Sequence, residues 1–216
     1  MVKKTIRPVI IDYGSGNIRS AIKAFEYVSG NQVLSTNKPV DLVNASHIIL
    51  PGVGAFADCK AGLNALPKLV DEIIQQVIVN KKPFLGICVG MQLMATLGRE
   101  HGETQGFDWI EGQIVKIESE NASLKVPHMG WNELILHKAT HPILSGLDAL
   151  SHAYFVHSYC FKAVHFEHVL ASVEYGDLIA AVVGRDNLVG TQFHPEKSQR
   201  VGLKLIKNFL NWDGEQ

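Results

Sequence analysis

The chain has 216 residues, of which 46% are hydrophobic and 19% charged, and its formal net charge is −1. This composition predicts one globular domain over residues 1–216, and the lack of any cluster of basic residues argues against a nucleic-acid partner. Apolar runs stay well below the ~18 residues of a membrane span and no signal-peptide core follows the N-terminus, so we expect no membrane partner and a cytoplasmic location.

The first predicted unit is a strand at residues 8–12, a glycine-rich loop at 13–17 and a helix that begins at Ile18. The loop is close to the GxGxxG pattern of dinucleotide-binding proteins, but Arg19 occupies the place of the third glycine. We therefore favour a loop that contacts a partner or a neighbouring strand over a nucleotide site.

Strands and helices continue to alternate after this unit. Two strands and two helices are predicted next, the strands at 32–35 and 46–50 and the helices at 58–63 and 67–80. In an open parallel sheet, ligands gather beyond the carboxyl ends of the strands. We therefore expect the loops after Asp12, Leu50 and Ile87 to face one crevice.

Residues 83–92 form the central motif of the chain. An apolar run predicts a buried strand, Gly86 and Gly90 flank Cys88, and a helical pattern follows, as in a nucleophile elbow with sulfur in place of oxygen. The glycines would keep side chains away from an incoming substrate, and the start of the helix would favour the thiolate and offer free N–H groups. Taken alone, the pattern fits a buried structural cysteine equally well.

Beyond the elbow we expect the helix to continue from Met91 through Leu97 and to end at Gly98. Alternating, β-branched segments then predict strands at 110–117, 127–132, 133–136, 154–157, 169–173, 179–183 and 188–193, followed by a helix at 200–210. The predicted fold class is α/β: a doubly wound, mostly parallel sheet with flanking helices and additional antiparallel strands in the second half.

The segment His194-Pro195-Glu196 follows the last predicted strand. A residue before proline favours extended backbone, in which residues i and i+2 project from the same side. His194 could then accept the proton of Cys88 while Glu196 orients the ring, which would give a cysteine triad. His-Pro-Glu alone would more often be a surface turn, but the two motifs together favour the triad.

Acyl transfer also requires hydrogen-bond donors where negative charge develops. We expect one such donor to be the backbone N–H of Val89, the residue after the nucleophile. The second must come from another loop, and the glycines of the loop 51–54 allow its peptides to turn toward the thiol, so we expect the N–H of Val53 there.

The other cysteines and the histidines do not predict a metal site. Cys59, Cys88 and Cys160 form no CxxC pair and are too dispersed for zinc or for a disulfide framework. The histidine-rich stretch 165–168 lacks the HExxH spacing of helical metal sites. We therefore expect no metal and no cofactor, and at least one thiol that stays reduced.

The motifs together resemble a known family. Residues 86–92 (GICVGMQ), 194–196 (HPE) and 51–54 (PGVG) resemble the class I (triad) glutamine amidotransferases. In that family the cysteine attacks the side-chain amide of glutamine, which gives a thioester and ammonia, and water then releases glutamate. The resemblance implies these roles for Cys88 as nucleophile, His194 as base and Glu196 as orienting group.

Three further stretches narrow the resemblance. Residues 12–17, 127–132 and 154–159 are similar to those of the glutaminase subunits of imidazole glycerol phosphate synthases, and the likeness spans essentially the whole chain. It implies that the ammonia passes to a cyclase partner, which makes imidazole glycerol phosphate and AICAR in histidine biosynthesis. The partner would be a β/α barrel that forms a heterodimer with this chain.

The resemblance also implies binding residues. Those that would hold glutamine are Gly54, Gln92, Glu100, His157, Ser158 and Tyr159. Those that would face the cyclase are Asn17, Arg19, Met129, Trp131 and Asn132. The family elbow usually carries leucine where Val89 stands, and the chemistry uses only the backbone N–H of that residue.

Two other interpretations stay open at this point. Glutaminase subunits that feed aminodeoxychorismate, anthranilate or GMP synthesis share the elbow and the His-x-Glu pair, although the 127–132 stretch is typical of the histidine-pathway subunit. A non-catalytic sensor on the same scaffold would use oxidation of Cys88. Such a sensor has no need of a general acid such as His194.

Overall fold

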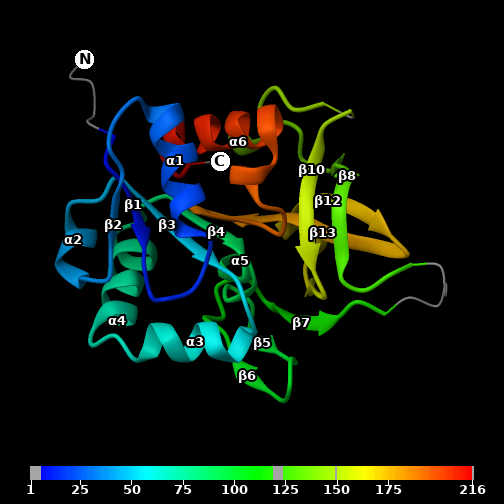
Figure 1. The fold of residues 1–216 in the computed structure, drawn as a ribbon, viewed down its shortest axis with the longest axis horizontal. Coiled ribbons are helices and arrows are strands. Elements are labelled where there is room, and N and C mark those ends of the chain that lie inside the picture. The colour runs from blue at the N-terminus through cyan, green and yellow to red at the C-terminus, as the bar shows by residue number, and fades with distance from the viewer. Residues whose placement is uncertain (1–5, 119–123, 149, 216) are drawn as a thin grey trace.

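A large central sheet organises the chain (Figure 1). The structure is a computed structural model that describes residues 6–118, 124–148 and 150–215. Within these residues the sheet has eight strands in the order β2-β1-β3-β4-β14-β13-β12-β9. Neighbouring strands are parallel from β2 to β14 and antiparallel from β14 to β9. The predicted parallel sheet with antiparallel additions in the second half is confirmed.

The strands of this sheet are short. In sheet order they are β2 (Leu34–Thr36), β1 (Pro8–Ile11), β3 (His47–Gly52), β4 (Phe84–Cys88), β14 (Leu188–Thr191), β13 (Asp177–Arg185), β12 (Val169–Tyr175) and β9 (Ile135–Leu136). β1, β3, β4 and β14 are buried along their whole length, as expected for apolar strands that are covered on both faces. β3 extends past its predicted end at Leu50, and Gly52 pairs in register with Cys88. The 51–54 loop therefore begins beside the elbow.

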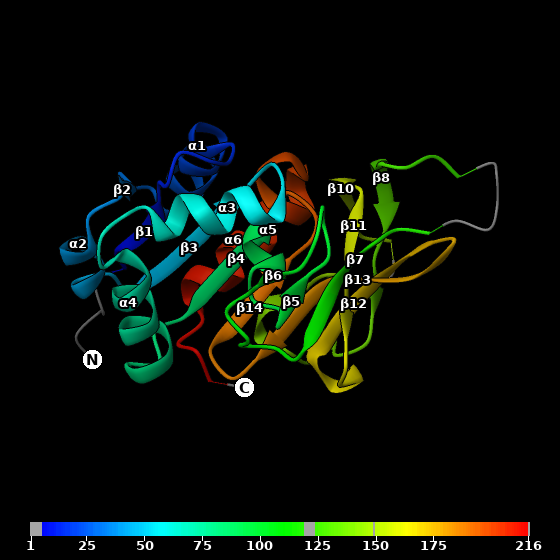
Figure 2. The same cartoon turned by 90° about the horizontal axis from the view of Figure 1, so that it is seen from below.

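Helices cover both faces of the sheet, so the fold is doubly wound (Figures 1 and 2). The helices are α1 (Ile18–Ser29), α2 (Pro39–Val43), α3 (Phe56–Asn64), α4 (Leu69–Ile74), which continues as the π-helical turn η1 (Gln75–Val79), and α6 (Gln199–Asn211). α1 and α6 lie on one face, where the rings of Phe25 and Phe209 meet edge to face at 6.4 Å. α3 and α4 lie on the other face, with the unpredicted α2 against α4.

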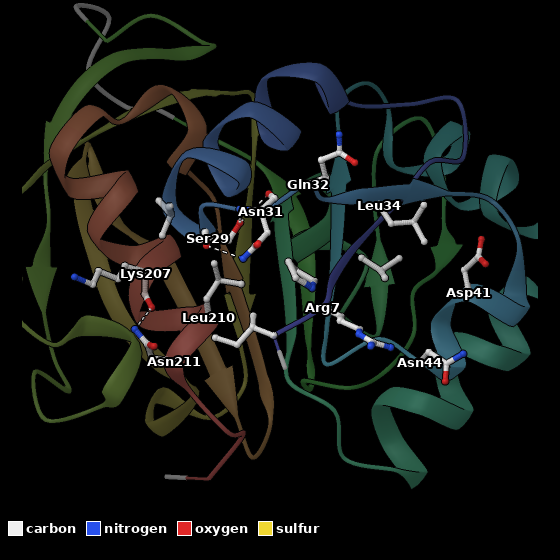
Figure 3. Close-up of a pocket in the computed structure, with 14 residues that line it drawn as sticks. Arg7, Ser29, Asn31, Gln32, Leu34, Asp41, Asn44, Lys207, Leu210 and Asn211 are labelled. Atoms are coloured by element: carbon white, nitrogen blue, oxygen red, sulfur yellow. Dashed lines mark hydrogen bonds between the residues drawn. The ribbon is translucent and has the colours of Figure 1, made fainter. Parts of the chain in front are cut away.

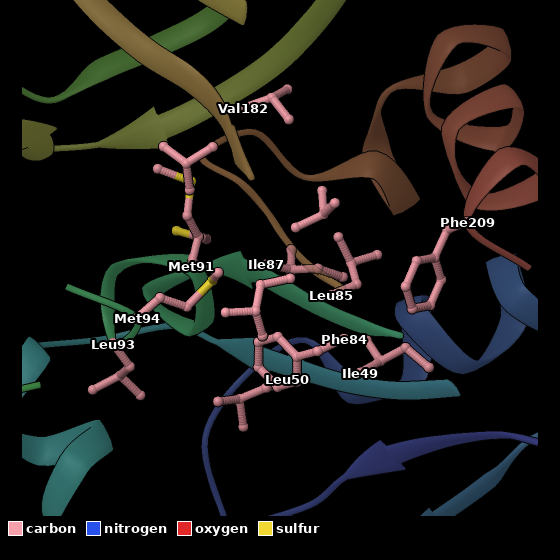
Figure 4. Close-up of a cluster of buried hydrophobic side chains, with 14 of the residues drawn as sticks. Ile49, Leu50, Phe84, Leu85, Ile87, Met91, Leu93, Met94, Val182 and Phe209 are labelled. Atoms are coloured by element: carbon pink, nitrogen blue, oxygen red, sulfur yellow. The ribbon is translucent and has the colours of Figure 1, made fainter. Parts of the chain in front are cut away.

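The apolar core is centred on β4 (Figure 4). Side chains from β3, β4 and α6, among them Leu50, Phe84 and Phe209, are fully buried there. Phe84 also meets Trp109 edge to face, with ring centroids 5.1 Å apart. Because protein interiors are close-packed, this core fixes the position of Cys88 at the carboxyl end of the strand.

Two smaller sheets lie beside the antiparallel half. One pairs β8 (His128–Glu133) with β10 (His152–His157), and the other has the order β11-β7-β5-β6. The strands of the second are β5 (Leu97–Gly98), β6 (Thr104–Gln105), β7 (Gly112–Lys116) and β11 (Tyr159–Ala163), and the 3-10 turns are η2 (Pro142–Leu144), η3 (Phe166–His168) and η4 (Pro195–Lys197). β10 packs against η4 and α6, so this strand lies next to the segment that carries His194.

The long helix predicted after the elbow is wrong. The helix α5 spans only Val89–Gln92, and Leu97–Gly98 forms β5. The carbonyls of residues 93–96 accept hydrogen bonds from backbone N–H groups of residues 106–110. These long-range bonds override the local helical pattern.

In the described part of the chain, no helix combines the length and apolar character needed to cross a membrane. The prediction made for the start of the chain concerns residues 1–5, which lie outside the described residues.

Candidate active site

Cys88 stands at the sharp bend between β4 and α5. Its backbone has φ 54° and ψ −111°, a conformation that costs a non-glycine residue about 1–3 kcal/mol and that occurs mainly where function requires it. A Cβ on Gly90 would lie 1.8 Å from the carbonyl oxygen of Leu50, and one on Gly86 would lie 2.5 Å from that of Gly90. The expected role of these glycines is therefore wrong: they allow backbone segments to pack closely behind the elbow.

The structure brings Cys88, His194 and Glu196 together. Nδ1 of His194 lies 2.8 Å from Oε1 of Glu196, and both side chains are only 3% exposed. This leaves Nε2 of the ring for the thiol of Cys88. Burial by itself lowers the pKa of His194, but hydrogen bonds with Cys88 and Glu196 prevail and raise it to about 10. The raised pKa of His194 therefore favours the protonated ring, which is the form that can act as a general acid.

Backbone and hydroxyl contacts hold His194 in place. Its N–H donates to the carbonyl of Tyr154 at 3.1 Å. The hydroxyl of Ser198 donates to the carbonyl of His194 at 2.7 Å and accepts from the N–H of Tyr154 at 2.9 Å. These hydrogen bonds thus connect strand β10 to the turn η4 at His194.

The two expected oxyanion donors differ in their surroundings. Val89 is the first residue of α5, and a helix leaves its first N–H groups without an intrahelical acceptor. The N–H of Val53 instead donates to Oγ of Ser15 at 3.3 Å, and that hydroxyl donates to the carbonyl of Val53 at 2.5 Å. The peptide N–H of Val53 is therefore engaged with the loop after β1.

A cavity of about 420 Å³ opens at Cys88 and His194. Its walls include all six residues that were predicted to hold glutamine (Gly54, Gln92, Glu100, His157, Ser158 and Tyr159), both residues that were predicted to supply oxyanion donors (Val53 and Val89), and three that were not predicted (Pro127, Val156 and Lys197). Six segments of the chain thus converge on one cavity. The loops after β3 and β4 contribute to it, as expected, whereas the loop after β1 supplies no lining residue and instead contacts Val53 through Ser15.

Protein contacts orient two of these cavity residues. Nε2 of Gln92 donates to the carbonyl of Tyr159 and to Oε1 of Gln192, both at 3.1 Å. Oε2 of Glu100 accepts the N–H of Phe56 at 2.8 Å, which satisfies a free donor at the start of α3. Glu100 therefore links the cavity to that helix.

The sequence analysis missed Gln192. This side chain is fully buried, and its Nε2 lies 3.7 Å from the sulfur of Cys88. Strand alternation could not have singled it out, because β14 ends at Thr191 and the chain bends at residues 192–193.

The residues expected to face a partner lie in two places. Met129 and Trp131 are 67% and 48% exposed on one side of β8, whereas Asn132 is half-buried on the opposite side. Asn17 is the half-buried residue before the first turn of α1, and Arg19 is exposed. Their role at an interface stays a prediction.

A larger cavity of about 890 Å³ lies away from this chemistry, at the amino end of β1 (Figure 3). The residues around it include Arg7, Leu34 and Lys207, and they come from β1, β2, α1, α2, α6 and the adjoining loops. Its lining contains no cysteine and no histidine among the described residues. The smaller cavity therefore carries the reactive groups.

Comparison with known proteins gives the class. The family model "Glutamine amidotransferase class-I" matches residues 9–212, and the chain belongs to this family. A crystal structure of a glutamine amidotransferase has a TM-score of 0.72 at 21% identity, over 94% of this chain and 97% of that one. A glutamine amidotransferase from Thermotoga maritima has a TM-score of 0.61 at 16% identity, over 96% of this chain and 84% of that one. At these identities the two structures show the shared fold.

Sequence relatives define the branch. The imidazole glycerol phosphate synthase subunit HisH of Cereibacter sphaeroides is 51% identical over 208 residues, which cover 94% of this chain and 98% of that protein. HisH of Agrobacterium fabrum is 50% identical over 216 residues, which cover 96% and 99%. Within its class the chain is thus a member of the HisH subunits and a glutamine-hydrolysing enzyme. The resemblance seen in the sequence is confirmed.

Proposed function

We propose that Cys88, His194 and Glu196 carry out the glutamine hydrolysis of this subunit, whose pathway is histidine biosynthesis. The observation that carries the assignment is the position of His194 between the thiol and the Glu196 carboxylate. General base and general acid are the roles that such an imidazole performs in a cysteine triad.

The reaction follows from these positions. The thiolate of Cys88 attacks the side-chain amide carbon of glutamine, and the carbonyl electron pair moves onto oxygen. Nε2 of His194 gives its proton to the amide nitrogen, the C–N bond breaks, and ammonia leaves a thioester behind. His194 then accepts a proton from a water molecule while the water oxygen attacks the thioester carbon. The C–S bond breaks, which releases glutamate and restores the Cys88 thiolate and the protonated His194.

The cavity residues supply binding and charge stabilisation in this proposal. Glutamine lies against Gly54, Gln92, Glu100, His157, Ser158 and Tyr159, which surround the nucleophile. The oxyanion accepts hydrogen bonds from the N–H of Val89 and, once its peptide is released from Ser15, from the N–H of Val53. One such donor is worth on the order of 10²–10³ in turnover.

The partner in this proposal is a cyclase with a β/α-barrel fold that forms a heterodimer with this chain and makes imidazole glycerol phosphate and AICAR. The relatives are subunits of a synthase, which supports a partner subunit. Free ammonia becomes ammonium at neutral pH and then is not nucleophilic, so the product has to reach an acceptor site without entering bulk water. Asn17, Arg19, Met129, Trp131 and Asn132 are the residues proposed to face that partner.

The remaining alternatives are weaker. Relatives at about 50% identity are HisH subunits, which favours the histidine pathway over aminodeoxychorismate, anthranilate or GMP synthesis. A sensor would not need the Glu196-backed imidazole. The proposed location is the cytoplasm, and the free thiols of Cys59, Cys88 and Cys160 fit a reducing compartment.

A diazo-ketone analogue of glutamine tests the nucleophile. We expect mass spectrometry to find the label on Cys88 alone and the Cys88→Ala variant to stay unlabelled. Cys59 and Cys160 are matched controls, since both are buried thiols. A label on either of these, with Cys88 unmodified, would overturn the assignment.

Activation by the partner is tested by assaying glutamine hydrolysis in the isolated chain and in the complex with the acceptor nucleotide bound. We expect a faster rate in the complex, because docking would release the Val53 peptide from Ser15. Equal rates would remove the case for coupled activation.

A further inference from the structure

A network of hydrogen bonds lies behind the proposed glutamine pocket and crosses the paired strands β8 and β10. Nδ1 of His128 lies 2.9 Å from Nε2 of His157, and Nδ1 of His157 lies 2.9 Å from the carbonyl oxygen of Tyr159. At the other end, Nδ2 of Asn132 lies 3.4 Å from Nε2 of His128. His128 and His157 are 3% and 6% exposed, so the bond between the two rings is shielded from water.

The proton positions in this network follow from one acceptor, the carbonyl of Tyr159. The carbonyl of Tyr159 can only accept, so Nδ1 of His157 carries a hydrogen. In a neutral ring the Nε2 of His157 is then an acceptor, and Nδ1 of His128 must supply the donor. Nε2 of His128 is left as an acceptor for the amide of Asn132. Asn132 thus donates to His128, His128 to His157, and His157 to the Tyr159 carbonyl, so all three donors point from β8 toward the pocket.

Burial and stacking support neutral rings in fixed orientations. Burial lowers the pKa of both His128 and His157 to about 4. The ring of His128 is stacked between Phe155 and Tyr175, with centroids at 4.7 and 4.0 Å. Asn132 uses its second amide hydrogen on the carbonyl of Glu174 at 3.0 Å, so its orientation is also determined.

Further hydrogen bonds connect this network to the nucleophile. The Tyr159 carbonyl that accepts from His157 also accepts from Nε2 of Gln92 at 3.1 Å. Gln92 bonds Gln192, and Nε2 of Gln192 lies 3.7 Å from the sulfur of Cys88. His157, Tyr159 and Gln92 themselves line the cavity, whereas His128 stands one step behind it.

We infer that His128 is a positioning residue for the glutamine pocket: as its Nδ1–H tautomer it holds His157, and through the Tyr159 carbonyl it fixes Gln92 beside the nucleophile. The role of the pocket rests on the proposed glutaminase function, but the two tautomers do not. His128 touches no reacting atom, and its effect passes through His157.

Nitrogen NMR of the imidazole rings tests the tautomers in the unmodified chain. Two-bond proton–nitrogen spectra of the full chain at neutral pH should show the Nδ1–H form for both His128 and His157. The variants His128→Phe and His157→Phe assign the two spin systems. An Nε2–H form at either ring would overturn the inference, whatever the enzyme assay shows.

Matched substitutions at His128 then test positioning. Phenylalanine keeps a ring between Phe155 and Tyr175 but donates nothing, so we expect kcat/KM for glutamine to fall at least about tenfold. Asparagine places an N–H near the former Nδ1 and should recover most of the loss, whereas glutamine places its amide near Nε2 and should not. A purely structural role would rank the variants by melting temperature instead. Wild-type kcat/KM in His128→Phe, or no recovery in His128→Asn, would overturn the inference.

The two proposals fail in distinguishable ways. If the diazo-ketone analogue does not label Cys88 while the rings of His128 and His157 both show the Nδ1–H form, then the glutaminase assignment fails and the hydrogen-bond network remains. If labelling occurs but either ring has the other tautomer, then only the positioning role is lost.

Discussion

His194 depends on its neighbours for its charge. Burial disfavours the imidazolium, and the contacts with Cys88 and Glu196 more than offset that cost, so the pKa rises to about 10. A group whose folded pKa is raised stabilises the fold fully below its unfolded pKa of about 6.5, and this contribution is lost as the pH rises through the folded value. The alkaline side of the pH range is therefore where the site is sensitive.

Replacing Glu196 tests this dependence. Glu196→Gln keeps the shape of the side chain but removes the carboxylate that raises the pKa of His194, so the imidazolium loses its proton at lower pH. We expect kcat to fall by ~10²–10⁴-fold and the alkaline limb of the kcat/KM profile to move to lower pH. The control is the exposed Glu167→Gln on η3. An alkaline limb that stays in place would contradict the role of Glu196.

Gly90 has no room for a side chain. Because a Cβ there would lie 1.8 Å from the Leu50 carbonyl, Gly90→Ala must push α5 away from β3. We expect a loss of about 2–4 kcal/mol in the free energy of unfolding, measured by urea denaturation. Gly14→Ala is the control, since it has a positive φ of 86° but open space, and strain alone should cost about 1–2 kcal/mol. Equal losses would show that packing at the elbow is not the cause.

The positions of several candidate site residues were predictable because these residues lie within or next to a strong motif. Cys88 and its elbow follow from spacing, and the backbone preference before proline predicts the extended conformation of His194. The expected extended path through Glu196 is wrong, because Pro195–Lys197 forms the 3-10 turn η4, and this turn brings the Glu196 carboxylate to Nδ1 of His194. Gln192 was not predictable in this way, because the predicted strand 188–193 ends at Thr191 and the chain bends at residues 192–193. The Ser15 contact with Val53 could not be predicted, because it joins loops 38 residues apart through one hydroxyl.

At the scale of elements, the loops after β1 and β3 are joined closely. Ser15 bonds both the N–H and the carbonyl of Val53, and the thiol of Cys59 lies 3.3 Å from the same hydroxyl. A Cβ on Gly16 would lie 3.4 Å from the side chain of Pro51, so the two loops are in direct contact. The loop that carries a proposed oxyanion donor is therefore held by its neighbour.

Removing the hydroxyl tests whether this contact restrains the donor. In Ser15→Ala the Val53 peptide loses both bonds, so we expect higher glutaminase activity in the isolated chain, up to the 10²–10³ that one oxyanion donor is worth. Stability should fall by about 1 kcal/mol. Ser20→Ala, a half-buried serine in α1, is the control. Unchanged or lower activity in Ser15→Ala would show that the hydroxyl does not restrain the donor.

The order of strands and helices was largely predictable, because apolar periodicity is a local property. Two of the exceptions have long-range causes. Residues 93–96 leave the helix since their carbonyls bond residues 106–110. β11 was missed, and it forms by antiparallel pairing with β7 far away in the chain.

At the scale of the whole molecule, the active-site end also carries exposed apolar side chains. Met129 and Trp131 project from the outer side of β8, where the Trp131 ring meets that of Tyr154 at 6.0 Å, and Lys197 lies over Tyr154 at 5.7 Å. Lys197 also lines the catalytic cavity. A partner that covers this surface would therefore lie over the cavity. That residues 1–216 form one domain stays a prediction.

Truncating Trp131 tests this surface. Aromatic residues often dominate binding energy, so Trp131→Ala should raise the Kd for the proposed cyclase partner at least about tenfold. Glutamine hydrolysis by the isolated chain should not change, because Trp131 lies outside the cavity. Val40→Ala, 67% exposed on α2, is the control for loss of an exposed apolar side chain. Calorimetry that finds equal affinities for both variants would place the interface elsewhere.

The two-sided character of β8 has a consequence for sequence change. Alternate residues of this strand lie on opposite sides of it: His128 and Asn132 face the protein interior, and Met129 and Trp131 face solvent. Deleting a single residue before the strand would slip its register by one and exchange the two sets. The histidine would meet solvent and the tryptophan would enter the protein, so one such deletion would remove the pocket support and the exposed apolar surface in the same event.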